Sequence, residues 1–214
     1  MKQFLTDFAN AMASINLSID GHRSRDNQYA PGIGPYGEDQ IVDRVMALLS
    51  QQAPDLYIDH HIRPGNSVRR ILGLEGYTGP SGSLATPDLV LSNRITEFKI
   101  ARPLRDNGER EDTWFKKVFE PNPDSYSTFL DVEKLCLFDE KHDPEGKFEK
   151  WVVIIGFERL DEKEYDLDGL FPGLFTYISE KIRGRKVREF INHTAVLGDR
   201  HPYHQVAKLY AFRY

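Results

Sequence analysis

The chain has 214 residues, of which 40% are hydrophobic and 12% aromatic, and its formal net charge is −5. This composition excludes an intrinsically disordered chain, and no apolar run is long enough to cross a membrane. A single cysteine, Cys136, excludes an internal disulfide and a thiolate metal cluster. The acidic total counts mildly against nucleic-acid binding, although a local basic face can still bind phosphate. We expect a soluble, cytoplasmic protein that forms one domain over residues 1–214.

Hydrophobic periodicity predicts the first half of the chain as helices followed by strands. The expected elements are a helix over 1–16, a loop over 20–37, a helix over 37–52, a strand over 56–62, and a Gly-rich loop over 73–86. Two apolar runs, 87–92 and 95–101, then predict an antiparallel hairpin, because only Asn93 and Arg94 separate them.

The second half alternates between helical and strand-like patterns. A polar stretch at 102–125 is expected to be a mobile loop over a site. The elements expected after it are a helix over 126–138, a strand over 151–160, a helix over 173–182, and strands over 188–198 and 204–214. This order predicts an α/β sandwich in which helices flank one mixed central sheet.

The hairpin carries the residues with the clearest chemical meaning. Glu97 and Lys99 are two positions apart, so they point to the same face of a strand. If Ser92 and Asn93 form the turn, Asp88 lies opposite Glu97, with Cβ atoms about 4.5–5.5 Å apart. Two carboxylates that close favour a divalent cation, to which the backbone carbonyl of Phe98 could add a ligand. Lys99 would then stand beside the metal, where it can orient a water molecule and stabilise a phosphate.

A second register of the hairpin has a different meaning. If the turn is Asn93-Arg94, Asp88 faces Lys99 instead of Glu97. The pair would then be an ordinary cross-strand salt bridge of small energetic value. Periodicity alone leaves both registers open.

Glu38 supports the metal-site interpretation. It precedes Ile41, Val42 and Val45 by three, four and seven residues, which places it on their face of the predicted helix. An isolated charge on a core-facing stripe is costly, so Glu38 could be directed at the same cation. The alternative is a partly solvated first-turn acid stabilised by the helix dipole.

The pattern of Pro87-Asp88 followed by Glu97-Phe98-Lys99, with Glu38 on the preceding helix, resembles the PD-(D/E)xK nuclease superfamily, which includes many restriction endonucleases. The resemblance implies a restriction-endonuclease-like αβββαβ core, over about 37–160, and hydrolysis of phosphodiester bonds with Mg²⁺, for which Mn²⁺ may substitute. It also implies that Asp88 and Glu97 bind the metal, Lys99 assists the attacking water, and Glu38 supports the metal site.

Basic residues outside the hairpin are candidates for contacts to DNA. The stretch 181–188 contains Arg183, Arg185, Lys186 and Arg188, which could contact the phosphate backbone or simply end a solvated helix. Arg69 and Arg70, beside the Gly-rich loop, are further candidates. The expected role is a Mg²⁺-dependent endonuclease in restriction, defence or repair, and cleavage of both strands would favour a homodimer or larger assembly. The alternative is a nuclease-fold binding module without catalysis.

The histidines carry less information. His201 and His204 flank Pro202 and Tyr203, but no acid or cysteine nearby in the sequence completes a set of metal ligands. We therefore expect a structural role for this pair.

Overall fold

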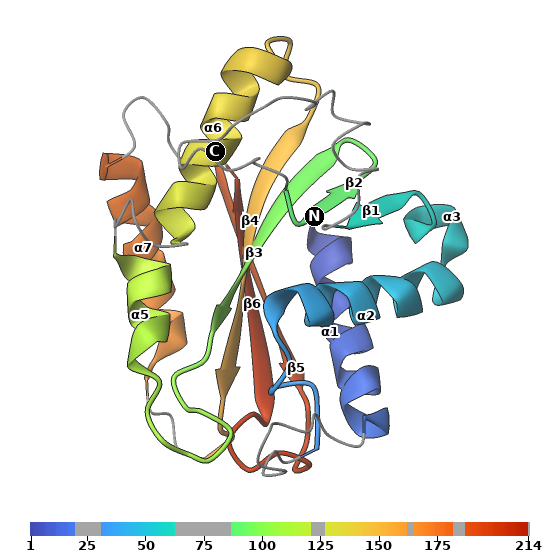
Figure 1. The fold of residues 1–214 in the computed structure, drawn as a ribbon, viewed down its shortest axis with the longest axis vertical. Coiled ribbons are helices and arrows are strands. Elements are labelled where there is room, and N and C mark those ends of the chain that lie inside the picture. The colour runs from blue at the N-terminus through green and yellow to red at the C-terminus, as the bar shows by residue number, and fades with distance from the viewer. Residues whose placement is uncertain (20–30, 63–86, 121–126, 162–164, 182–186, 214) are drawn as a thin grey trace.

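The computed structural model describes residues 1–19, 31–62, 87–120, 127–161, 165–181 and 187–213. They form an α/β fold around one open, mixed sheet of six strands in the order β1-β2-β3-β4-β6-β5 (Figure 1). Only β3 and β4 pair in parallel, and the other neighbours are antiparallel. The strands are β1 His60–Ile62, β2 Leu89–Leu91, β3 Arg94–Ala101, β4 Glu149–Glu158, β5 Glu189–Val196 and β6 Val206–Arg213.

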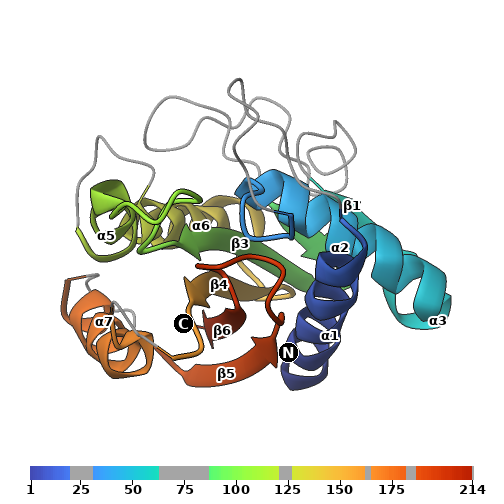
Figure 2. The ribbon, with the colours of Figure 1, turned by 90° about the horizontal axis from the view of Figure 1, so that it is seen from below.

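Helices cover both faces of the sheet (Figure 2). The described helices are α1 Lys2–Ser18, α2 Glu38–Gln52, α3 Pro54–Tyr57, α5 Asp112–Phe119, α6 Thr128–His142 and α7 Leu167–Lys181. One core joins α1, α2 and α3 to the first face, and a second core joins α5, α6 and α7 to the opposite face. Alternation along β3 explains this division: Phe98 belongs to the first core, whereas Ile95 and Ala101 belong to the second.

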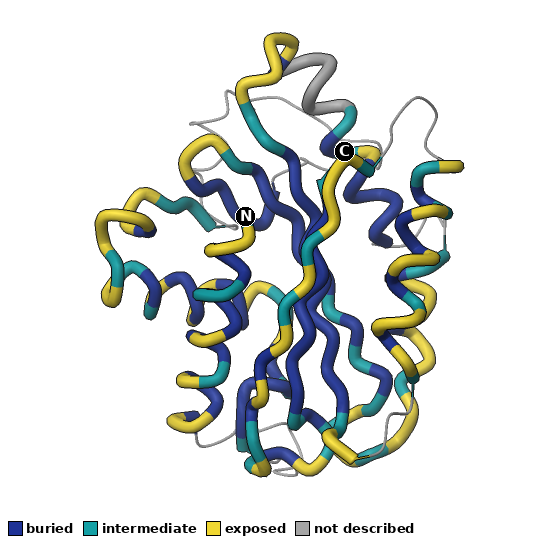
Figure 3. Tube along the Cα trace, turned by 180° about the vertical axis from the view of Figure 1, so that it is seen from behind, coloured by how far each residue is buried: buried dark blue, intermediate teal, exposed yellow. Residues whose placement is uncertain are grey.

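Burial is greatest in the central strands and decreases toward β5 (Figure 3). Strand β4 is buried from Lys150 to Glu158, because helices cover both of its faces. Strand β5 lies at the edge of the sheet and buries only Ala195 fully. The site described below lies at β3, beside the most buried part of the sheet.

Two sequence-based expectations for local structure were wrong. Residues 56 and 57, the start of the predicted strand 56–62, belong to helix α3, because Pro54 at the first helical position favours a helical start. Residues 112–119 of the predicted mobile loop form helix α5. Trp114 and Val118 are buried four positions apart, and Glu111 caps the helix by accepting from the backbone N–H of Thr113.

The remaining predicted helices and strands occur with shifted ends, and the Gly-rich loop expected over 73–86 lies outside the described residues. Helix α7 begins at Leu167, six residues before the expected start, and contains Pro172. The predicted hairpin, the helix before it and the two late strands all form. No helix in the described part of the chain is long and apolar enough to span a membrane.

Candidate metal and nucleic-acid site

The register of the hairpin places the two expected acids opposite each other. Leu89 pairs with Thr96, and Leu91 with Arg94, which leaves Ser92 and Asn93 as the turn. Ser92 adopts a φ of 53°, a left-handed conformation typical of a tight turn. Continuing the same pairing by one residue sets Asp88 against Glu97. The register that would place Asp88 opposite Lys99 is therefore excluded.

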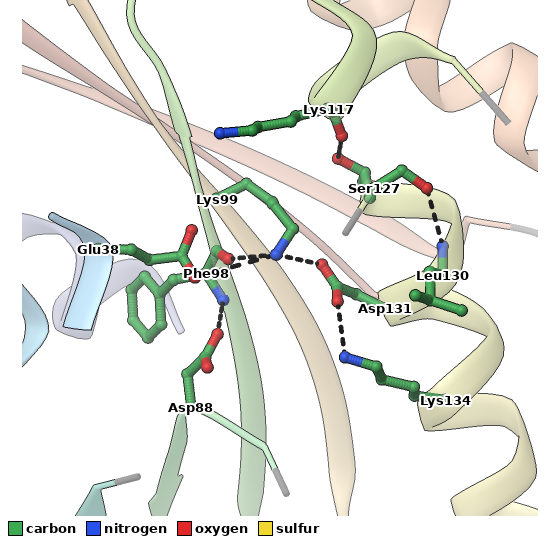
Figure 4. Close-up of polar contacts among 10 residues, drawn as sticks. Glu38, Asp88, Phe98, Lys99, Lys117, Ser127, Leu130, Asp131 and Lys134 are labelled. Carbon is green, nitrogen blue, oxygen red and sulfur yellow. Dashed lines mark hydrogen bonds and ion pairs between the residues drawn. The ribbon is translucent and has the colours of Figure 1, made fainter. Parts of the chain in front are cut away.

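Asp88 continues the strand pairing through its side chain. Asp88 comes directly before Leu89, the first paired residue of β2. Its Oδ2 atom accepts a hydrogen bond of 2.7 Å from the backbone N–H of Phe98 (Figure 4). Asp88 and Glu97 are each 3% exposed. The hairpin thus holds two buried carboxylates on the face that α5 and α6 cover.

Lys99 brings the charged groups together. Its Nζ lies 2.8 Å from Asp131 Oδ2, 3.9 Å from Glu38 Oε1 and 3.2 Å from the carbonyl oxygen of Phe98 (Figure 4). The Phe98 carbonyl, expected as a metal ligand, therefore faces the site and accepts a hydrogen bond from Lys99. Lys99 is only 8% exposed, so its ammonium group is largely shielded from solvent.

The sequence analysis missed Asp131. This residue lies in the first turn of α6, which Ser127 begins by accepting from the N–H of Leu130. Asp131 is buried and contacts both Lys99 and Lys134, the latter at 3.4 Å. Its position four residues before the core residue Leu135 could have revealed it, by the argument used for Glu38.

Glu38 reaches the site from the other side of the cleft. It begins α2, and one of its carboxylate oxygens lies within 4.8 Å of oxygens from both Asp39 and Asp88. Glu97 is not part of this compact group, although it lines the same cleft. The structure thus brings Glu38, Asp88, Glu97 and Lys99 to one site, and adds Asp39 and Asp131.

The carboxylates of this site are held in unfavourable surroundings. Burial raises the pKa of Glu38 to about 8, and Asp88 and Asp131 add to this effect while Lys99 opposes it. Burial, with Asp88 and Asp131, also raises the pKa of Glu97 well above its ordinary value. Burial lowers the pKa of Lys99, but Asp131 and Glu38 outweigh it, so the pKa ends above its ordinary value. Glu38 and Glu97 therefore ionise less easily than exposed glutamates, chiefly because burial removes water from their carboxylates.

A cleft of about 610 Å³ opens onto these groups. Glu38 and Asp39, from the start of α2, form one wall, and Lys117 and Lys134, from α5 and α6, form the facing wall. The floor includes Glu97 and Lys99 from β3, and the full lining is Gly37, Glu38, Asp39, Gln40, Glu97, Lys99, Ile100, Arg102, Glu111, Thr113, Trp114, Lys117, Asp131 and Lys134. The two walls differ in charge, so the cleft is electrostatically asymmetric.

Of the basic residues expected to contact DNA, Arg188 lies in the part of the chain that the structure describes. Arg69, Arg70, Arg183, Arg185 and Lys186 lie outside the described residues. Arg188 is exposed just before the edge strand β5 and is not among the residues that line the cleft.

A second polar cluster, formed by Asp106, His201 and His204, lies outside this cleft. No acid was predicted to join the two histidines, but the fold supplies Asp106, whose Oδ1 lies 3.9 Å from His201 Nε2 and 3.8 Å from His204 Nδ1. Both rings are buried. Burial lowers the pKa of His201 to about 4 and that of His204 well below its ordinary value, so both rings are neutral near pH 7.

Hydrogen bonds set the tautomers of these two rings. Nδ1 of His201 accepts from the backbone N–H groups of Tyr203 and His204, so the proton of the neutral ring is on Nε2, the atom that faces Asp106. His204 donates from Nε2 to the carbonyl of Leu104, which leaves a lone pair on Nδ1. A metal ligand needs a lone pair on the atom that faces the ion, so His201 does not suit a cation here. The cluster instead connects the loops that contain these residues.

Comparison with known proteins adds no family assignment: no protein-family model, curated protein or solved structure matches the chain.

Proposed function

We propose that this protein is a metal-dependent nuclease that hydrolyses phosphodiester bonds of DNA. The order of α2, β1, β2, β3, α6 and β4 along the chain agrees with the αβββαβ core that the motif resemblance implies, with α3 and α5 as additions. This order supports the proposal, but the residues of the cleft supply its main evidence.

The observation that carries the proposal is the surplus of buried carboxylates around one ammonium group. Glu38, Asp88 and Glu97 share the site with Lys99, whose strongest partner is a fourth acid, Asp131. Oxygen ligands grouped in this way suit a hard divalent cation such as Mg²⁺, with Mn²⁺ as a substitute. Asp88, Glu97 and Glu38 would hold the ion, and the carbonyl of Phe98 could join them if Lys99 moves away.

The residues of the site have separable roles in this proposal. When bound, the divalent ion would supply Lewis-acid stabilisation of the phosphate and a water of lowered pKa. Lys99 donates hydrogen bonds to the attacking water or to a phosphate oxygen, because its ammonium stays charged next to Asp131. Asp88 also anchors the backbone of Phe98, so one residue both shapes the strand end and offers a ligand oxygen.

The direct test is cleavage of plasmid DNA in the presence of Mg²⁺ by the wild-type chain and by Lys99→Ala. We expect nicking or linearisation by the wild type, prevented by EDTA, and a loss of at least about 100-fold in Lys99→Ala, since Lys99 contacts the reacting groups. Both proteins are purified in parallel from a nuclease-deficient host, so that a contaminant would cleave equally in both samples.

A matched control is Lys150→Ala. Like Lys99, Lys150 is a buried lysine that pairs with a buried acid, in this case Asp143. It lies in β4 and does not line the cleft. This variant should keep its cleavage rate at a temperature where it is folded. Equal cleavage by the wild type and Lys99→Ala would exclude the role of Lys99, and no Mg²⁺-dependent cleavage by the wild type would leave the binding-module alternative.

A further inference from the structure

The wall of the cleft formed by α5 and α6 has a charge pattern that the hairpin residues do not explain. Lys117 lines the cleft from α5, is exposed, and forms no ion pair with any residue that the structure describes. In Figure 4 its side chain extends from α5 over the space beside Lys99. An exposed ammonium group across the cleft from the carboxylates of Glu38 and Asp39 is available for an anionic ligand.

Lys134, from α6, adds to the positive charge of this wall. Asp131 lies between Lys134 and Lys99 of the cleft floor, with its two carboxylate oxygens 2.8 Å from Lys99 Nζ and 3.4 Å from Lys134 Nζ. On the wall itself, Asp131 offsets one of the two positive charges of Lys117 and Lys134, and Glu111, which also lines the cleft, is paired with Arg105. The α5–α6 wall keeps a surplus of positive charge, whereas the facing wall carries Glu38 and Asp39.

The two helices of this wall are fixed to each other. The hydroxyl of Thr128, the first residue of α6, donates to the backbone carbonyl of Lys117 at 3.5 Å. Trp114 and Val118 of α5 pack into the same core as Val132 and Leu135 of α6. The lysines therefore project from a packed surface, which sets their spacing before a ligand arrives.

We propose that the α5–α6 wall binds the phosphodiester backbone of the substrate, with Lys117 and Lys134 contacting phosphate oxygens and Asp131 holding Lys99 and Lys134 in place. This inference rests on the proposed function, because it places the substrate strand in the same cleft. A phosphate between the walls would meet ammonium groups on one side and the carboxylates on the other, where a divalent cation would separate the like charges.

The structure offers a matched pair of variants on one helix. Lys116 and Lys117 are adjacent and exposed in α5, but only Lys117 lines the cleft. We would measure the binding of fluorescently labelled duplex DNA by anisotropy over a range of salt concentrations, with Ca²⁺ as the divalent ion and the DNA checked for integrity on a gel. Lys117→Ala should weaken binding roughly 5-fold or more and reduce the slope of log K against log salt by about 1.

Lys116→Ala should change neither the affinity nor the salt slope appreciably, since it removes the same charge from the same helix outside the cleft. Charge reversal extends the comparison: Lys117→Glu should bind more weakly than Lys117→Ala, and Lys116→Glu should resemble the wild type. Because both positions are exposed on a helix, circular dichroism is expected to show native folding for each of the four variants.

Equal effects of the Lys116 and Lys117 substitutions would overturn the assignment of the wall. The test of DNA binding by the wall can fail or succeed independently of the test of nuclease activity. If the wild type cleaves plasmid with Mg²⁺ and the Lys116 and Lys117 substitutions change DNA binding equally, the nuclease function would stand and DNA binding by the α5–α6 wall would be rejected. If DNA binding depends on Lys117 but the wild type does not cleave, DNA binding by the α5–α6 wall would stand and the nuclease activity would be rejected.

Discussion

The cleft at β3 and the Asp106–His201–His204 cluster both bring potential metal ligands together, yet their protonation differs. In the cleft, Glu38 and Glu97 are carboxylates whose pKa values are raised by burial and by neighbouring acids. In the second cluster, backbone groups engage His201 and place its proton toward Asp106. The first arrangement gains from a cation, whereas in the second the proton on His201 Nε2 points to the place that a cation would need.

This difference shows that, for recognising a metal site, the proximity of the ligand atoms is a weaker criterion than whether each atom has a free lone pair. Carboxylate oxygens of Glu38, Asp39 and Asp88 and the ligand atoms of the histidine cluster are each grouped within 4.8 Å. Only in the acidic group do all the converging atoms carry lone pairs. The two clusters should therefore respond in opposite ways when one of their members is removed.

The largest effect is expected for Glu97→Gln. Cleavage should fall by roughly 100-fold or more, because the variant lacks a negatively charged ligand. The metal-free protein should nevertheless be more stable at about pH 8, by about 1–2 kcal/mol or roughly 2–8 °C in Tm, since a neutral glutamine avoids the cost of either ionising the buried Glu97 or keeping it protonated. Plasmid cleavage and thermal unfolding in EDTA measure the two effects. A large loss of stability would contradict the placement of Glu97 among repelling acids.

An intermediate effect is expected for His204→Ala. This change removes a buried ring and its 3.0 Å hydrogen bond to the Leu104 carbonyl, so the free energy of unfolding should fall by about 2–4 kcal/mol. Mg²⁺-dependent cleavage should persist below the lowered Tm, because His204 does not line the cleft. Elemental analysis of the wild type should find no stoichiometric transition metal. Tightly bound zinc that disappears in His204→Ala would show that the two clusters are alike after all.

The smallest effect is expected from pH. Because the pKa of Glu38 is raised from 4.5 to about 8, its folded form binds a proton more tightly than its unfolded form, and stability falls as pH rises between these values. His201 has a pKa lowered from 6.5 to about 4, so its contribution is lost as pH falls between these values.

Thermal unfolding with and without Mg²⁺ at about pH 5.5 and about pH 8 tests these slopes. Mg²⁺ should raise Tm more at the higher pH, where it competes with fewer protons at Glu38. Glu38→Gln should reduce the loss of stability as pH rises toward about 8, without altering the loss of stability that His201 causes as pH falls toward about 4. An equal Mg²⁺ shift at both pH values would argue against binding by Glu38.

The sequence by itself determined the secondary elements with strong periodicity and the residues of the hairpin. Alternation put Glu97 and Lys99 on one face of β3, and helical spacing put Glu38 on the buried side of α2. These are local properties, because the geometry of a strand or a helix fixes the direction of side chains two, three or four positions apart. The same local rules failed at α5, where a polar composition concealed the buried pair Trp114 and Val118.

Only the tertiary structure decided what those residues face. The register that sets Asp88 against Glu97 depends on a turn with Ser92 at positive φ, and both registers satisfied the apolar pattern of the hairpin. Asp131 meets Lys99 because α6 packs on the face of the sheet to which Lys99 points, and Asp106 meets two histidines near the other end of the chain. Contacts between residues so far apart depend on how whole elements pack, and no periodicity within one element encodes that packing.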